Sequence, residues 1–239
     1  MATVILVRHG RTTANATGVL AGRTAGVRLD SVGRTQAERT AERLAVVPLA
    51  GLVTSPLERC RQTARILLER QGGSPATHID RALTECDYGQ WQGRTLSDLV
   101  TEPLWSVVQT QPSAAVFPGG ESMTAMHARA VAAVRRHDAA FEAEHGPGAV
   151  WAAVSHGDVI KSVLADALGM HLDLFQRLHV GPASISIVRY GGSRPEVVAT
   201  NTEFGDLSWL AAVGPVGDAP VGGGVGHEVL VEPAERARS

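Results

Sequence analysis

Hydrophobic runs and helical periods alternate along the first 204 residues of the chain. Runs of mostly aliphatic and β-branched residues cover residues 2–7, 51–54 and 149–154, and such runs are typical of strands buried on both faces. Residues 185–190 and 197–200 form a further strand pair around two glycines. Between the runs, apolar residues recur every three or four positions, as on a helix with one buried face. Strand followed by helix, repeated, predicts an α/β domain whose sheet is mainly parallel.

The predicted helices begin at recognisable caps. Asp30 and Ser31 start one helix, and Pro48 ends it. Ser55 caps the next helix, with Pro56 at its first position, and this helix runs to about residue 72. Two more helices are predicted, one over 121–146 and one from the residues after 155 to 169.

Two segments break the alternation. Residues 80–120 carry turn residues and aromatic side chains, and their apolar positions follow no extended helical or strand period. We interpret this segment as an insertion that covers a functional site. The last 35 residues, 205–239, hold 7 glycines and 3 prolines and no periodic apolar stripe. They predict a flexible tail that follows a single domain over 1–204.

Composition narrows the class of protein. The 239 residues carry 22 basic and 24 acidic side chains, so no basic surplus indicates nucleic acid or a membrane surface as partner. The two cysteines, Cys60 and Cys86, form no CxxC pair and no disulfide framework, which favours a cytoplasmic location. The first apolar run stops at Arg8, too early for a signal peptide or a membrane span. The sequence leaves open whether the chain forms a homodimer.

Chemically active side chains follow the predicted strands. Arg8, His9 and Gly10 come directly after the first strand, His156 after the strand over 149–154, and Arg59 one turn into the second helix. Sites in open α/β sheets gather at the carboxyl ends of strands, so these residues should converge. The glycine after each histidine would let the backbone approach a ligand. Because arginine forks match phosphoryl oxygens, the pocket is predicted to bind a tetrahedral oxyanion.

A histidine in such a pocket can also act as the nucleophile of a phosphoryl transfer. Neutral imidazole is nucleophilic, so it attacks phosphorus and forms a phosphohistidine. The leaving alkoxide then needs a proton, and Glu85 in the 80–120 segment is the candidate acid. Asp87 lies close by in sequence and is the alternative.

Several motifs together resemble the histidine phosphatase superfamily, in its phosphoglycerate mutase-like branch. The first is Arg8-His-Gly-Arg-Thr-Thr-Ala-Asn15. The others, in chain order, are Leu29-Asp-Ser-Val-Gly-Arg-Thr-Gln36, Ser55-Pro-Leu-Glu-Arg59, Glu85-Cys-Asp-Tyr-Gly-Gln-Trp91, Phe117-Pro-Gly-Gly-Glu-Ser122 and Ser155-His-Gly157. Six motifs in the same order over residues 8–157 make the resemblance specific.

The resemblance implies a three-layer α/β/α sandwich and a metal-independent phosphomonoester phosphatase without a cofactor. His9 would be the nucleophile, and Arg8 and Arg59 would hold the phosphoryl oxygens. His156 would stabilise the transferring group, and Glu85 would be the general acid and then the base. The implied substrate-binding residues are Gly10, Thr12, Asn15 and Gly157. Arg11 departs from relatives that carry an acidic residue there, which leaves the small phosphorylated substrate unidentified.

Other interpretations remain open from the sequence. A metal-dependent hydrolase is disfavoured, because no HxxxH pair or nearby acidic group accompanies His9 and His156. A phosphoglycerate mutase-type phosphotransferase is disfavoured because residues 95–120 contain no Lys or Arg. A non-catalytic phospholigand-binding protein should have lost a catalytic residue, and none is lost. The aromatic side chains of the middle segment line the pocket or belong to the core; these are Tyr88, Trp91, Trp105 and Phe117.

Overall fold

Within residues 2–191, 194–203 and 222, which the computed structural model describes, six strands form one sheet in the order β3-β2-β4-β1-β5-β6. The four strands β3, β2, β4 and β1 are parallel, and β5 and β6 continue the sheet antiparallel. The mainly parallel sheet predicted from the sequence is therefore present. The strands are β1 (Thr3–Arg8), β2 (Gly51–Thr54), β3 (Ala76–Ile79), β4 (Val150–Ser155), β5 (Ile185–Tyr190) and β6 (Pro195–Thr202).

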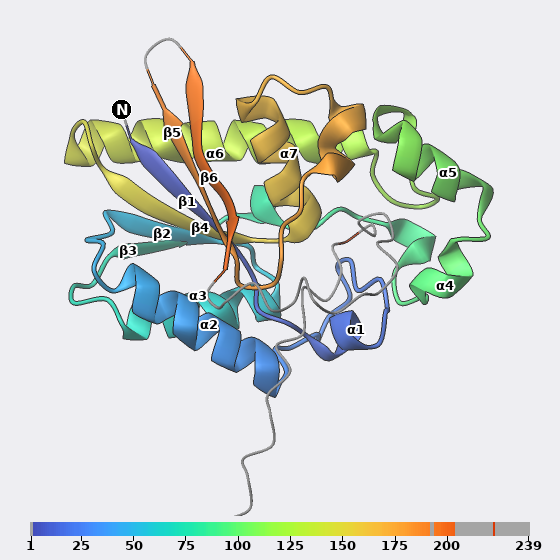
Figure 1. Cartoon of the computed structure of the whole chain (residues 1–239), viewed down its shortest axis with the longest axis horizontal. Coiled ribbons are helices and arrows are strands. Elements are labelled where there is room, and N and C mark those ends of the chain that lie inside the picture. Colours follow the sequence, from blue (N-terminus) through green and yellow to red (C-terminus); the bar gives the residue numbers. More distant parts are fainter. Residues whose placement is uncertain (1, 192–193, 204–221, 223–239) are drawn as a thin grey trace, which may run out of the picture.

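Helices cover both faces of this sheet (Figure 1). One face carries α2 (Ser31–Leu44) and α3 (Glu58–Glu69), and the other carries α6 (Met123–His145) and α7 (Gly157–Ala167). The three-layer α/β/α fold is thus confirmed. Short helices lie beside the sheet: α1 (Thr13–Ala16), α4 (Leu96–Leu99) and α5 (Pro103–Thr110), with 3-10 turns at Arg81–Leu83, Gly89–Trp91, Pro112–Ala114 and Leu172–Arg177.

The first strand shows why an uninterrupted apolar run suits this position. Val4 and Leu6 belong to the hydrophobic core beneath α6 and α7, whereas Ile5 and Val7 belong to the core beneath α2 and α3. Because side chains alternate between the faces of a strand, a strand between two helical layers needs apolar residues at every position.

The structure corrects the predicted start of the second helix. Helix α3 begins at Glu58 with Leu57 as its N-cap, so Pro56 lies outside it. The Ser55 hydroxyl, predicted to cap the helix, instead hydrogen-bonds His156 Nε2 at 2.8 Å. The predicted helix after Asp30 is present, and the Asp30 carboxylate accepts a hydrogen bond from Gly33 N at 2.7 Å. That helix ends at Leu44, four residues before Pro48.

The segment 80–120 is more ordered than its sequence predicts. It contains α4, α5 and three of the 3-10 turns. Tyr88, Trp91 and Phe117 are fully buried in the core, and Trp105 packs against it. Their rings contact one another edge to face or stacked, with centroids 5.0 to 6.2 Å apart. Of these four aromatic residues, Tyr88 also lines the pocket described below.

The predicted tail over 205–239 lies outside the described residues except for Gly222. The Gly222 amide donates to Asp158 Oδ2 at 3.1 Å, and Gly222 is among the residues that line the pocket. Across the described ranges, none of the helices has both the length and the apolar character that a membrane crossing demands. The division into a domain over 1–204 and a flexible tail stays a prediction.

Candidate active site

The carboxyl ends of the four parallel strands bring the predicted site residues together. Arg8 is the last residue of β1, and His9 follows it. Arg59 lies in the first turn of α3, after β2, and Glu85 follows the 3-10 turn after β3. His156 directly follows β4. Adjacent parallel strands therefore deliver five polar side chains to one edge of the sheet.

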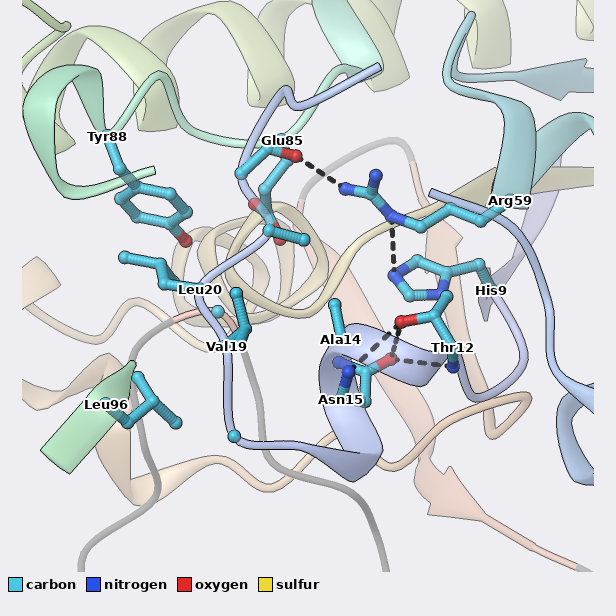
Figure 2. Close-up of a pocket in the computed structure, with 14 residues that line it drawn as sticks. His9, Thr12, Ala14, Asn15, Val19, Leu20, Arg59, Glu85, Tyr88 and Leu96 are labelled. Carbon is cyan, nitrogen blue, oxygen red and sulfur yellow. Dashed lines mark hydrogen bonds between the residues drawn. The ribbon is translucent and has the colours of Figure 1, made fainter. Parts of the chain in front are cut away.

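His9 is buried and held in one tautomer. Its Nδ1 lies 2.8 Å from the carbonyl oxygen of Gly10, so Nδ1 carries the proton and donates it to that oxygen. The lone pair on Nε2 is left to face the pocket, where Arg59 Nε donates to it at 3.2 Å (Figure 2). Burial, followed by the charges of Arg59 and Arg8, lowers the pKa of His9 well below its ordinary value. His9 is a neutral imidazole with its nucleophilic nitrogen in the pocket.

Gly10 has a different reason to be glycine from the one the sequence indicates. A Cβ on Gly10 would lie 2.2 Å from the carbonyl oxygen of Gly33 in α2, so a side chain there would collide with backbone. The Gly10 amide donates to Thr63 Oγ1 at 3.2 Å. The glycine lets the loop after β1 pack against α2 and α3, and this packing fixes the loop that carries His9.

Arg59 connects three parts of the site. Besides its bond to His9, its NH2 group donates to the Gly22 carbonyl oxygen at 2.7 Å and to His156 Nδ1 at 3.1 Å. Burial lowers the pKa of Arg59, while the nearby Cys60, Glu85 and Tyr88 raise it. The guanidinium thus holds its position among hydrogen-bond acceptors before any ligand arrives.

Arg8 is completely buried beneath the site. Its NH1 group donates to the Val180 carbonyl oxygen at 2.8 Å and its NH2 group to that of Gly222 at 3.5 Å. Burial lowers the pKa of Arg8 to about 10, against the opposing influence of Glu85 and Asp158. A pKa near 10 keeps the side chain cationic at neutral pH, so Arg8 supplies positive charge beside His9.

His156 lies against His9, with ring centroids 5.2 Å apart and the rings edge to face. Arg59 donates to its Nδ1, and the Ser55 hydroxyl meets its Nε2. Burial and the charge of Arg59 lower the pKa of His156 well below its ordinary value. A hydroxyl both donates and accepts, so Ser55 fits either neutral tautomer. Because Arg59 donates to Nδ1, the proton of the neutral ring lies on Nε2 in this structure and is donated to the Ser55 hydroxyl.

Thr12 and Asn15 form a reciprocal cap at the start of α1. The Thr12 amide and hydroxyl both donate to Asn15 Oδ1, at 3.1 and 2.8 Å, and the Asn15 amide donates to Thr12 Oγ1 at 3.2 Å. Both residues line the pocket (Figure 2). Since the oxygen of the Asn15 side chain is engaged by Thr12, its NH2 group is the part available to an anion.

Glu85 is a buried carboxyl group in the same pocket. The Cys86 amide donates to its Oε1 at 3.0 Å. Burial, and next the negative charge of Asp158, raise the pKa of Glu85 to about 7, although Arg59 and Arg8 oppose the shift. A carboxyl group with this pKa is partly protonated at neutral pH, as a general acid must be.

The pocket is polar at one end and apolar along its wall. The described residues that line it are His9, Thr12, Ala14, Asn15, Gly18, Val19, Leu20, Ala21, Gly22, Arg59, Glu85, Tyr88, Leu96 and Gly222. Five of the nine predicted site residues are among them. The other four, Arg8, Gly10, His156 and Gly157, are not among the lining residues, and Gly157 is the first residue of α7. No group of three or more His, Cys, Asp or Glu side chains in the described ranges is arranged to hold a metal ion.

Sequence comparison agrees with this arrangement of fold and pocket. A profile of the histidine phosphatase superfamily (branch 1) matches residues 4–203, which is most of the chain. The protein belongs to the histidine phosphatase superfamily. The resemblance and the enzyme class predicted from the sequence motifs are therefore confirmed.

Individual histidine phosphatase relatives match over most of their length. The probable phosphoglycerate mutase GpmB of Yersinia pestis is 31% identical over 192 residues, which cover 80% of this chain and 86% of that protein. The mycobacterial glucosyl-3-phosphoglycerate phosphatase has a TM-score of 0.75 and 28% identity, covering 84% of this chain and 99% of the other. YhfR of Bacillus stearothermophilus has a TM-score of 0.74 and 26% identity, covering 86% and 98%.

Two details of this histidine phosphatase were not predicted. Ser55 contacts His156, whereas the sequence indicated only a helix cap; the Ser-Pro-Leu-Glu-Arg motif was the available signal. Tyr88 donates a 2.6 Å hydrogen bond to Asp158, the carboxylate that helps to raise the pKa of Glu85. Arg11 pairs with Asp30, the N-cap of α2, at 2.9 Å and is not among the residues that line this pocket.

The burial of Glu85 predicts a pH-dependent stability difference. The folded carboxyl group has a pKa of about 7 and the unfolded one ionises near 4.5, so folded chains retain a proton that unfolded chains release between these pH values. Stability must then fall as pH rises through this window. Glutamine does not ionise, so the free energy of unfolding of Glu85→Gln should not fall in this way. Relative to wild type, it should increase by up to about 3 kcal/mol between pH 5 and pH 8.

Urea denaturation of both proteins at the two pH values measures this difference. Glu144→Gln, on the exposed end of α6, is the matched control and should behave as wild type. A Glu85→Gln advantage of equal size at pH 5 and pH 8 would contradict the raised pKa.

Proposed function

We propose that the protein hydrolyses small phosphomonoesters through a phosphohistidine on His9. The observation that carries this proposal is the tautomer of His9. The Gly10 carbonyl holds its Nδ1 proton, and the Nε2 lone pair lies in a pocket with Arg59 and a raised-pKa carboxyl group. Nucleophile, positive charge and acid are the three parts that phosphoryl transfer to a side chain needs.

The reaction proceeds in two displacements. In the first, the Arg59 Nε donor passes from His9 Nε2 to a phosphoryl oxygen, which frees the lone pair. His9 Nε2 then attacks phosphorus, the bond from phosphorus to the leaving oxygen breaks, and Glu85 gives its proton to that oxygen. In the second, water attacks the phosphohistidine, gives a proton to the Glu85 carboxylate, and the bond from phosphorus to nitrogen breaks to release inorganic phosphate. Glu85 returns to its protonated form, so one residue serves both steps.

The charged groups around the phosphoryl position support this assignment. Arg59 and Arg8 balance the negative charge, and the Asn15 NH2 group and the Gly157 amide at the start of α7 are further donors. With phosphate bound, His156 takes the other neutral tautomer in this proposal: the Ser55 hydroxyl donates to Nε2, and Nδ1–H donates to a phosphoryl oxygen. The predicted contribution of Thr12 comes through Asn15, and a direct ligand contact of Gly10 stays a prediction because its amide donates to Thr63.

The wall of the pocket favours hydrolysis over mutase activity. Ala14, Val19, Leu20, Ala21 and Leu96 line it, and among the described lining residues Arg59 is the one arginine. A bisphosphorylated sugar acid would bring a carboxylate and a second phosphoryl group to this wall, where burial without a partner is costly. The similarity to a mycobacterial phosphatase agrees with hydrolase activity, while the similarity to GpmB keeps mutase activity as the second candidate.

The proposal also includes a cytoplasmic location. It is supported by the two cysteines, which are buried free thiols and form no disulfide with each other.

Vanadate and a chelator test the proposed mechanism together. Vanadate adopts the trigonal bipyramidal geometry of the transferring phosphoryl group, so it should inhibit competitively at low concentration, and EDTA should leave activity unchanged. The mycobacterial relative was solved with VO3. Arg59→Met should raise the inhibition constant for vanadate roughly 10- to 100-fold, since a hydrogen bond to a charged group contributes about 1.5–3 kcal/mol.

Arg61→Met is the matched control, because Arg61 is an exposed arginine on the same helix. This variant should keep the wild-type inhibition constant. Loss of activity in EDTA that zinc or magnesium restores would overturn the metal-independent mechanism. Release of no inorganic phosphate from any phosphomonoester would favour the non-catalytic binding protein.

A further inference from the structure

An arginine in the N-terminal half of α6 holds the backbone of the segment that carries Glu85. Arg129 NH1 donates to the carbonyl oxygens of Ala82 and Thr84, at 2.7 and 2.6 Å, and its NH2 group donates to that of Glu85 at 3.1 Å. Residues 84–87 form neither helix nor strand, so their carbonyl groups lack the partners that regular structure supplies. One guanidinium thus donates to three backbone carbonyls, one in the 3-10 turn and two in the irregular segment that follows it.

Glu121 fixes the direction of that guanidinium. Its carboxylate accepts from Arg129 Nε at 3.0 Å and from Arg129 NH2 at 2.5 Å, a bidentate pair of fixed geometry. It also accepts from the Asp87 amide at 2.9 Å. Burial acts to raise the pKa of Glu121, but the hydrogen bonds from Arg129 and Asp87 outweigh it and lower the pKa, so the carboxylate stays ionised.

A second arginine, Arg23, also binds both the Glu85 backbone and the Glu121 carboxylate. Arg23 Nε donates to the Glu85 carbonyl oxygen at 2.9 Å, and its NH2 group reaches Glu121 Oε1 at 2.8 Å. Arg23 follows Gly22, whose carbonyl oxygen accepts from Arg59. The Glu85 backbone is therefore tied to the loop that also positions the arginine beside His9. We name Arg23, Glu121 and Arg129 the Glu85 clamp.

We infer that the Glu85 clamp, and Arg129 above all, positions the Glu85 carboxyl group against the leaving group of the substrate. None of the three residues lines the pocket that contains His9 and Glu85; they line a separate, open pocket instead. In this inference they therefore act through the backbone of Glu85 and not by contact with the phosphoryl group. A displacement of about 1 Å of a catalytic group costs on the order of a hundredfold in rate. The inference rests on the proposed role of Glu85 as general acid.

Arg129→Met removes the guanidinium and keeps the apolar stem. For an alkyl phosphate, which needs a proton on its leaving oxygen, kcat/KM should fall about 30- to 100-fold. For p-nitrophenyl phosphate, whose leaving group departs without a proton, kcat/KM should stay within about threefold of wild type. The decline of the alkyl phosphate rate above pH 7, which reports Glu85 ionisation, should flatten in the variant.

The double variant with Glu85→Gln separates positioning from general loss of structure. If the clamp acts only through Glu85, adding Arg129→Met to Glu85→Gln should cost less than about threefold more. A purely structural role would impose its full loss in both backgrounds. Arg135→Met is the matched control, since Arg135 lies on the same helix in an exposed ion pair with Asp166, and it should match wild type. Vanadate inhibition should be unchanged in Arg129→Met.

Three outcomes overturn the inference. They are equal losses on both phosphates, no loss on either, or a full additional loss in the Glu85→Gln background. Glu121→Gln repeats each comparison if Arg129→Met does not fold, because it removes the charge that directs Arg129 and keeps the side-chain volume. If Glu85→Gln by itself shows no dependence on the leaving group, the proposed acid fails, and that result is distinct from a failure of Arg129 alone.

Discussion

His9→Ala should abolish turnover of every phosphomonoester while the protein remains folded. The variant loses the only group proposed to attack phosphorus, and removal of a nucleophile costs on the order of a thousandfold or more in rate. The neighbouring strand does not depend on this imidazole, because β1 is held by its ladders to β4 and β5 and by apolar contacts on both faces.

Rapid-quench experiments with radiolabelled substrate measure the same step directly. Wild type should show a protein-bound phosphoryl group that is stable in alkali and lost in acid, as expected of a bond from phosphorus to nitrogen, and His9→Ala should show none. His145→Ala, at the exposed end of α6, is the matched control and should keep both the label and the rate. Wild-type turnover in His9→Ala would remove the proposed nucleophile.

The strands of the sheet centre were predictable because the interior of each is an unbroken apolar run. β1, β2 and β4 lie between two helical layers, and their side chains are buried on both faces. β3 was not predicted, because it is the edge strand and all four of its residues, Ala76–Ile79, are exposed. An exposed edge strand has no hydrophobic pattern to distinguish it from a loop, so its pairing with β2 decides its structure.

The residues of the candidate site also fall into a group that the sequence pattern predicts and a group that it does not. Arg8, His9 and His156 follow strands directly, so the general position of sites in α/β sheets was enough to place them. Arg129 is one of several arginines on an amphipathic helix, and nothing in the local pattern distinguishes it from the exposed Arg135. Its role depends on the irregular path of residues 82–87, and sequence periodicity carries no information about that path.

Glu85→Gln should separate substrates by the quality of their leaving groups. Glutamine has the shape of the acid but gives no proton, so an alkyl phosphate, whose alkoxide is a poor leaving group, should lose about 100- to 10,000-fold in kcat/KM. p-Nitrophenyl phosphate leaves as a stabilised phenolate and should lose much less. In wild type, kcat/KM for the alkyl phosphate should fall as pH rises above about 7, where Glu85 gives up its proton, and this decline should be absent in Glu85→Gln.

Pre-steady-state kinetics with p-nitrophenyl phosphate add a second, independent result. His9 is intact in Glu85→Gln, so the phosphoenzyme still forms and releases one equivalent of nitrophenol quickly. Its hydrolysis lacks the base that takes the proton from water, so a burst should precede a slow steady state.

Asp87→Asn is the comparison variant, because Asp87 lies two residues away and faces Arg23 instead of the pocket. Equal losses on both substrates without a burst in Glu85→Gln would reduce Glu85 to a residue that shapes the pocket. A burst in Asp87→Asn instead would identify Asp87 as the general acid. The backbone segment held by Arg129 would then have to change its conformation so that the Asp87 carboxylate faces the substrate.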